Sequence, residues 1–131
     1  MTQTFIYFSV YLVNMKPLTL EYTAGIIDGE GSLGLHTNHK TMVQQPAISV
    51  NLVKTPESEA LLQGFLNLLG GHVYTKPKEY WTKYGLNARD QIEWRLYGSK
   101  EIYDVCKILL PYLKLKQKDC KILMKFCAKH L

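Results

Sequence analysis

Acids and glycines alternate in the short segment Thr23-Ala24-Gly25-Ile26-Ile27-Asp28-Gly29-Glu30-Gly31. The apolar spacing from Leu18 onward predicts a helix that ends at Gly29-Glu30-Gly31. Asp28 and Glu30 would then lie at the negative end of the helix dipole, which disfavours a carboxylate. A hard divalent cation such as Mg²⁺ would make them favourable, because it takes oxygen ligands of this kind. The segment therefore indicates either a metal site or two solvated turn acids.

The glycines of this segment suggest a second partner. Gly25 and Gly29 are four residues apart, so they share one face of the predicted helix. Glycine inside a helix costs about 1 kcal/mol relative to alanine, and a pair of them favours a face that another backbone approaches closely. One or two carboxylates cannot cage a metal, but a second copy of the helix and a phosphate would complete the site. A simple bend at the glycines is the alternative.

Length and composition narrow the class of protein. The chain has 131 residues, 47% hydrophobic and 21% charged, which suits one compact globular domain. Its three cysteines form no CxxC pair, so we expect free thiols in a reducing compartment. The longest apolar stretch is too short to cross a membrane and lacks signal-peptide features. We expect an intracellular protein that is neither secreted nor a membrane protein.

The net charge of +5 is concentrated at the end of the chain. The last eighteen residues hold Asp119 and six lysines, namely Lys114, Lys116, Lys118, Lys121, Lys125 and Lys129. A polyanion bound there would release counterions from its phosphates, so nucleic acid is the first partner to consider. A solvated lysine-rich helix without a partner is the alternative.

The elements that follow the acidic segment repeat a strand-strand-helix order. In sequence they are strands over 32–40 and 46–54, a helix over 55–69, strands over 72–79 and 91–97, and helices over 99–110 and from about 114. Thr55 caps the second helix and Gly70 ends it, while Ser99 caps the third. We predict an α+β fold, αββαββα over 18–131 with a four-stranded antiparallel sheet and a C-terminal helix. Residues 1–17 form an N-terminal extension.

At the acidic segment the chain resembles the LAGLIDADG homing endonucleases. The matching motif positions are Ala24, Gly25, Ile27, Asp28 and Gly31, and the element order after Leu18 resembles the family's core domain. Members with one motif are homodimers whose motif helices pack at a two-fold axis, so the resemblance implies a dimer interface at Ala24, Gly25 and Asp28. It further implies an intron-encoded enzyme of an archaeal cytoplasm or an organelle that cuts double-stranded DNA at a long pseudo-palindromic site.

The resemblance also implies which residues do the chemistry. It puts the metal-binding acid at Glu30, with the backbone carbonyl of Gly29 beside it, and the cofactor is then Mg²⁺ or Mn²⁺. Glutamate replaces the commoner aspartate there, and Asp28 resembles a helix-end residue with a structural role. Lys54 and Lys116 resemble residues that line the water network of the site. The implied reaction is metal-assisted phosphodiester hydrolysis, with Lys116 stabilising the anionic transition state.

Base recognition would fall to the polar face of the predicted sheet, whose strands are close in length to one turn of B-DNA. The candidates are Ser32, His36, Asn38, Lys40, Tyr74, Lys76, Lys78, Arg89, Glu93, Arg95 and Tyr97. Two other functions stay open for the same fold: a maturase that binds intron RNA, and a regulator that binds DNA without cutting. An intact Glu30 favours cleavage over the regulator.

Overall fold

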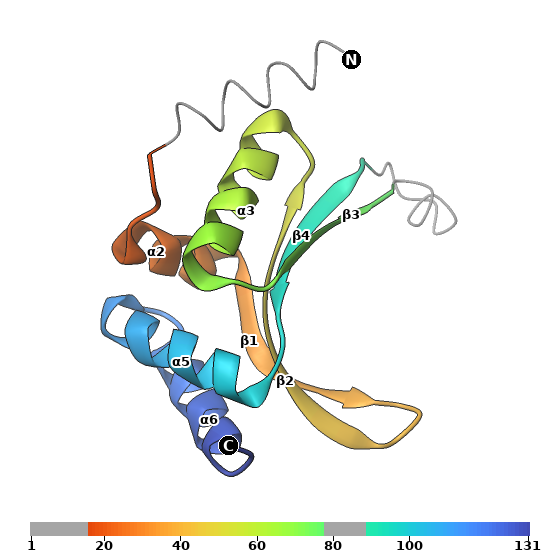
Figure 1. Ribbon diagram of the computed structural model, residues 1–131, viewed down its shortest axis with the longest axis vertical. Coiled ribbons are helices and arrows are strands. Elements are labelled where there is room, and N and C mark those ends of the chain that lie inside the picture. The colour runs from red at the N-terminus through yellow and green to blue at the C-terminus, as the bar shows by residue number, and fades with distance from the viewer. Residues whose placement is uncertain (1–15, 78–88) are drawn as a thin grey trace. The chain divides into compact units, whose positions relative to one another are not determined.

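The computed structural model describes residues 16–77 and 89–131 and confirms the predicted α+β architecture (Figure 1). Its elements are α2 (Leu20–Glu30), β1 (Gly31–Asn38), β2 (Val43–Val53), α3 (Pro56–Leu69), β3 (His72–Lys76), β4 (Gln91–Leu96), α5 (Ser99–Leu109), the 3-10 helix η1 (Leu110–Tyr112) and α6 (Gln117–Ala128). The strands form one antiparallel sheet in the order β1-β2-β4-β3. Within the described ranges no helix is long and apolar enough to cross a membrane.

The chain divides into two compact units. The first unit includes Asn51–Trp94 and holds α3, β3 and the adjoining ends of β2 and β4. The second unit consists of Thr19–Val50 and Arg95–Leu131 and holds α2, β1, most of β2, α5, η1 and α6. The acidic segment and all the terminal lysines therefore belong to the second unit.

Local signals set the first unit's helix as the sequence predicts. The Thr55 hydroxyl accepts a hydrogen bond from the Ser58 backbone N–H at 3.0 Å, and the Ser58 hydroxyl accepts from the Thr55 N–H at 2.8 Å. This reciprocal pair is a capping box. Gly70, with a φ of 78°, ends α3. The Trp94 indole donates to the Gly70 carbonyl at 2.7 Å and packs 5.2 Å from the Phe65 ring, which anchors α3 on β4.

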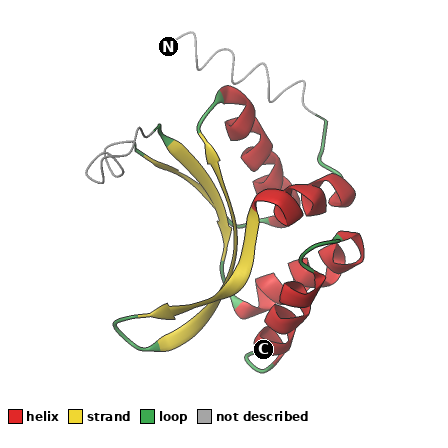
Figure 2. Cartoon of the chain, turned by 180° about the vertical axis from the view of Figure 1, so that it is seen from behind, coloured by secondary structure: helices red, strands yellow, loops and turns green. Residues whose placement is uncertain are grey.

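In the second unit, α2, α5 and α6 lie on one side of β1 and β2 (Figure 2). The paired residues Leu33 and Ile48 are buried on this covered side, as period-two alternation requires. Ile27 of α2 and Leu123 of α6 are also buried in the core of this unit. The opposite side of β1 and β2, which we call the open face, carries Ser32 and its neighbours at every second position.

Three predicted boundaries are wrong, each for a physical reason. The β1–β2 turn occupies 39–42 rather than 41–45, because the Asn38 side chain accepts the Lys40 N–H at 2.9 Å and closes the chain early. Gly98, with a φ of 94°, occupies the N-cap of α5, so Ser99 is the first helical residue and not the cap. The last helix starts at Gln117 rather than near Lys114, because the preceding backbone binds Asp28, as described next.

Candidate functional site

Asp28 on the last turn of α2 is bound by the backbone of a distant segment. Its carboxylate accepts hydrogen bonds from the N–H groups of Lys114, Leu115 and Lys116, at 2.7, 3.1 and 3.0 Å. Successive N–H groups that converge in this way form an anion-binding nest. The nest offsets the unfavourable helix dipole, so Asp28, which is 8% exposed, needs no metal ion to be stable there.

Lys116 completes this connection from the other direction. Its Nζ donates to the backbone carbonyl of Asp28, one of the last carbonyls of α2, which have no partner within the helix. Four hydrogen bonds therefore tie the end of α2 to the start of α6. The ammonium of the predicted site residue Lys116 is thus held at Asp28, which precedes Glu30 by two positions, and the Lys116 side chain is half-buried.

Glu30 differs from Asp28 in both exposure and bonding. It is the last residue of α2 and is exposed, and no described residue pairs with its carboxylate. Gly31 turns the chain sharply from this point into β1: a Cβ there would lie 2.7 Å from the Ile27 carbonyl oxygen, so only glycine fits. Within the described ranges, no three acidic, histidine or cysteine side chains gather into a metal site. Among the described residues, the end of α2 therefore presents one free carboxylate, that of Glu30.

The exposed face of α2 is formed by Tyr22, Gly25, Ile26 and Gly29, which we call the glycine face. A Cβ added at Gly25 or Gly29 would meet no atom within 4 Å, so no contact within the described chain requires glycine at these two positions. Tyr22 is 52% exposed beside them. Of the three residues that the motif predicts at a dimer interface, Ala24 and Asp28 are buried within their own chain and Gly25 is exposed. The interface itself stays a prediction.

The open face of the second unit carries several of the predicted DNA-binding residues. Ser32, His36 and Asn38 occupy alternate positions of β1, with Gly34 between the first two, and share this face. Asn38 is engaged in the turn described above, and Lys40 is exposed in that turn. On β4, the Arg95 guanidinium lies 5.3 Å from the centre of the ring of Tyr97, which is exposed and follows the strand.

Two polar residues of β2 extend this face and were missed. Gln45 lies opposite His36, and Ser49 lies opposite Ser32. Ser49 lies within the strand predicted over 46–54, so alternation alone would have identified it. Gln45 required that strand to begin a few residues earlier, as β2 does.

The first unit holds the remaining described candidates. Glu93 is 4% exposed; it accepts a hydrogen bond from the Tyr74 hydroxyl at 2.5 Å and pairs with the Lys76 ammonium at 2.9 Å. Glu93 therefore positions two side chains rather than standing free to read a base. Arg89 is exposed before β4. Lys78 lies outside the described residues.

Lys54 directly follows β2, also in the first unit. Its Nζ pairs with the Glu59 carboxylate at 3.2 Å. Its proposed place beside Glu30 stays a prediction.

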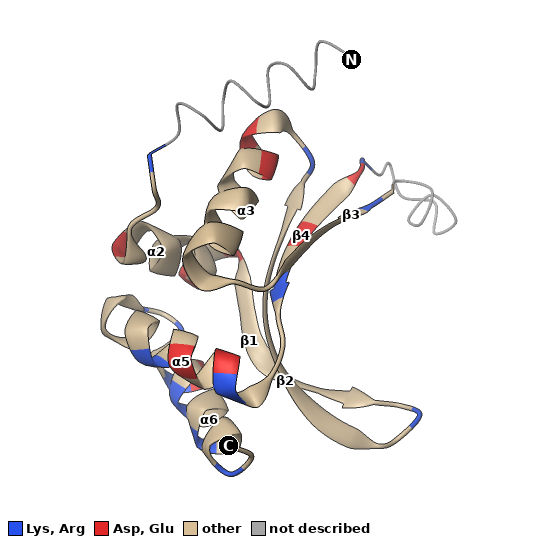
Figure 3. Cartoon of the chain, in the orientation of Figure 1, with Lys and Arg blue, Asp and Glu red and all other residues tan. Residues whose placement is uncertain are grey.

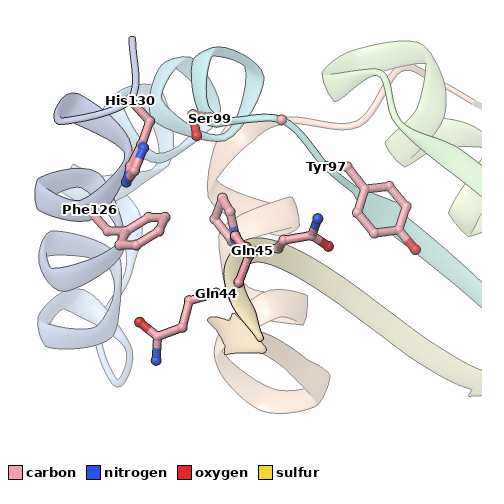
Figure 4. A pocket seen from close by; sticks show the side chains of 9 residues that line it. Gln44, Gln45, Tyr97, Ser99, Phe126 and His130 are labelled. Carbon is pink, nitrogen blue, oxygen red and sulfur yellow. The ribbon is translucent and has the colours of Figure 1, made fainter. Parts of the chain in front are cut away.

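A cleft of about 470 Å³ lies in the second unit, between the start of β2, the β4–α5 connection and the end of α6 (Figure 4). It is lined by Gln44, Gln45, Tyr97, Ser99, Phe126 and His130, among others. The strand register puts this cleft at the hairpin end of β1, whereas Glu30 precedes the other end. The cleft is therefore not part of the site around Glu30.

Comparison with known proteins identifies the fold. No protein-family model and no curated protein sequence matches the chain. Among solved structures, it has the fold of the LAGLIDADG homing endonucleases. Its similarity to the homing endonuclease I-CvuI, solved with its target and calcium, has a TM-score of 0.65 at 20% identity, over 84% of this chain and 66% of that one.

Two further structures show the same similarity. The LAGLIDADG homing endonuclease I-GzeII, in complex with a DNA target, gives a TM-score of 0.67 at 21% identity over 89% of this chain and 38% of that one. The group I intron-encoded homing endonuclease I-CeuI, complexed with DNA, gives 0.66 at 13% identity over 98% and 68%. The chain thus spans about two thirds or less of the length of these proteins, and the similarity establishes that it shares their fold.

Proposed function

We propose that the chain is a site-specific DNA endonuclease that works as a homodimer with a divalent metal ion. The observation that carries this proposal is the juxtaposition on α2 of the glycine face and the free acid Glu30. Two helices that pack through Gly25 and Gly29 would each place Glu30 at the same end of the pair. The dimer would then present two free carboxylates side by side, one from Glu30 of each chain.

The donors at the end of α2 fit a divalent cation. The Glu30 carboxylates of two copies, with the backbone carbonyl of Gly29, would hold Mg²⁺ or Mn²⁺, which are hard ions that prefer oxygen ligands. When bound, the ion would supply Lewis-acid stabilisation to the scissile phosphate. Asp28 is not counted among the ligands, because its oxygens already accept three backbone hydrogen bonds.

Other residues of the chain bind and orient the substrate in this proposal. The open face of β1 and β2 contacts base edges through Ser32, His36 and Gln45, which stand on one side of the strands. Lys116 brings a positive charge next to the last turn of α2, where negative charge develops on the phosphate. Lys54 orients water from its position after β2.

A cleavage assay tests the proposed function. The chain is incubated with Mg²⁺ and a plasmid that carries the intronless form of its host gene. We expect one linear product and, with EDTA in place of Mg²⁺, no product. Tight binding to the plasmid without any cutting would instead identify a DNA-binding regulator. Binding to the intron RNA, again without cutting, would identify a maturase, and either result would overturn the proposal.

A further inference from the structure

Three lysines lie in a row along the outer side of α6, and Lys129, the C-cap residue of that helix, continues the row. Lys118, Lys121, Lys125 and Lys129 recur every three or four residues, and at 100° per residue they fall within an arc of about 80°. The buried residues of the helix, Cys120, Leu123 and Cys127, lie on the opposite side. We call the four residues the lysine stripe.

The charges of the lysine stripe are uncompensated within the described chain. All four side chains are exposed, and none has an ion-pair partner in the described ranges. Asp119 is the single acid of α6. In Figure 3 the basic residues, drawn in blue, predominate along this helix. Like charges four residues apart destabilise a helix by about 0.2 to 0.5 kcal/mol per pair. Lys121, Lys125 and Lys129 form two such pairs, so the stripe lowers stability unless an anion binds it.

DNA on the open face does not account for the stripe. Helix α6 packs against α5 and against the covered side of β1, where Leu33 is buried. Ser32 and His36 stand on the other side of the same strand. The stripe faces away from α6's buried side, and therefore away from β1 altogether. A duplex that lies along the open face is separated from the stripe by the strand layer and the helix.

We propose that the lysine stripe binds the phosphate backbone of a second nucleic-acid segment, apart from the segment on the open face. Charge complementarity supports this occupant. The stripe spans twelve residues, or about 16 Å from end to end of the helix axis, which matches about five phosphates of one strand at 3.4 Å rise. The proposed occupant is a further stretch of duplex DNA, because the 3.4 Å rise that gives this match is that of a DNA strand. Binding at the lysine stripe does not depend on whether the chain cleaves DNA.

Salt dependence of binding tests the stripe with two labelled probes, a 20-base-pair DNA duplex of random sequence and an RNA hairpin with a 20-base-pair stem. Fluorescence anisotropy is measured between 0.05 and 0.3 M KCl for the full chain and for Lys121→Gln/Lys125→Gln. The double variant should flatten the slope of log affinity against log salt by up to about 1.8 and weaken binding by up to about 60-fold at 0.1 M. The DNA duplex should show the larger change, and a larger change for the RNA hairpin would overturn DNA as the occupant.

The matched control is Lys100→Gln/Lys107→Gln, which removes the same charge from exposed positions on α5. It should flatten the slope by less than half as much. Lys121→Arg/Lys125→Arg should retain the original slope, and urea midpoints should show that all variants fold. Unchanged slopes for the Gln variant, or an equal effect of the α5 control, would overturn the proposal.

Simultaneous occupancy is the second criterion. With the chain saturated by unlabelled DNA duplex, the labelled probe should form a slower-migrating ternary complex in a native gel. The complex should be lost in Lys121→Gln/Lys125→Gln. Displacement of one nucleic acid by the other, one for one, would mean that both occupy the open face and would contradict a second site.

Discussion

Replacement of Asp28 by Asn tests whether this acid has a structural role, in contrast to the catalytic role proposed for Glu30. Asp28 uses one carboxylate oxygen for Lys114 and the other for Leu115 and Lys116. The amide of Asn keeps one acceptor oxygen, loses the negative charge, and turns an NH₂ group toward a backbone donor. A hydrogen bond to a charged group contributes about 1.5 to 3 kcal/mol. We therefore expect the free energy of unfolding to fall by about 2 to 4 kcal/mol.

Urea denaturation measures this loss directly. For a chain of this size the slope of free energy against urea is about 2 kcal/mol per molar, so the midpoint should fall by roughly 1 to 2 M with the slope unchanged. Glu30→Gln is the matched control on the same turn: Glu30 is exposed and has no partner among the described residues, so its stability should stay within about 0.5 kcal/mol of the wild type. An Asp28→Asn protein as stable as the control would refute the role assigned to the nest.

Three further predictions concern glycine and cysteine. Gly31→Ala should lower the free energy of unfolding by about 1 to 3 kcal/mol, since the new Cβ would lie 2.7 Å from the Ile27 carbonyl oxygen. Gly34→Ala, which has open space around it, should avoid this clash, so equal losses of stability in thermal denaturation would contradict the close approach at Gly31. Gly25→Ala should stabilise helix α2 of the single chain by about 1 kcal/mol, because the new Cβ meets nothing within 4 Å in its own chain. The same Cβ would hold a second helix away, so sedimentation should shift toward the monomer, and an unchanged dimer would count against the glycine face. Cys106, Cys120 and Cys127 are buried free thiols, and burial raises the pKa of Cys127. At pH 8 a disulfide reagent should label all three only after unfolding, and rapid labelling of the native chain would be inconsistent with this packing.

Elements fixed by local chemistry were predictable from the sequence. Thr55 and Gly70 mark the ends of α3 by capping preferences that act within a few residues, and both act as expected. The run at Gly31 likewise ends α2 at the expected place. Alternation also put Ser32 and His36 on one face of β1.

Features that depend on distant contacts were not predictable. The carboxylate of Asp28 accepts hydrogen bonds from backbone groups more than eighty residues away, at Lys114 to Lys116, and no local sequence pattern predicts this contact. The same contact delays the start of α6, which propensity alone would place earlier. Glu93 is a second example. The sequence indicates only that it is a polar residue on a strand, whereas its contacts with Tyr74 and Lys76 arise because two strands pair.

Plasmid cleavage by the Glu30→Gln variant shows whether Glu30 holds the metal ion. We expect that, in Mg²⁺, this variant leaves the target plasmid supercoiled while its DNA affinity stays within about tenfold of the wild type, or roughly 1.4 kcal/mol. Glu21→Gln, which removes an exposed acid from the first turn of the same helix, should cut normally. A Glu30→Gln protein that linearises the plasmid at a rate comparable to the wild type would contradict the claim that Glu30 holds the metal.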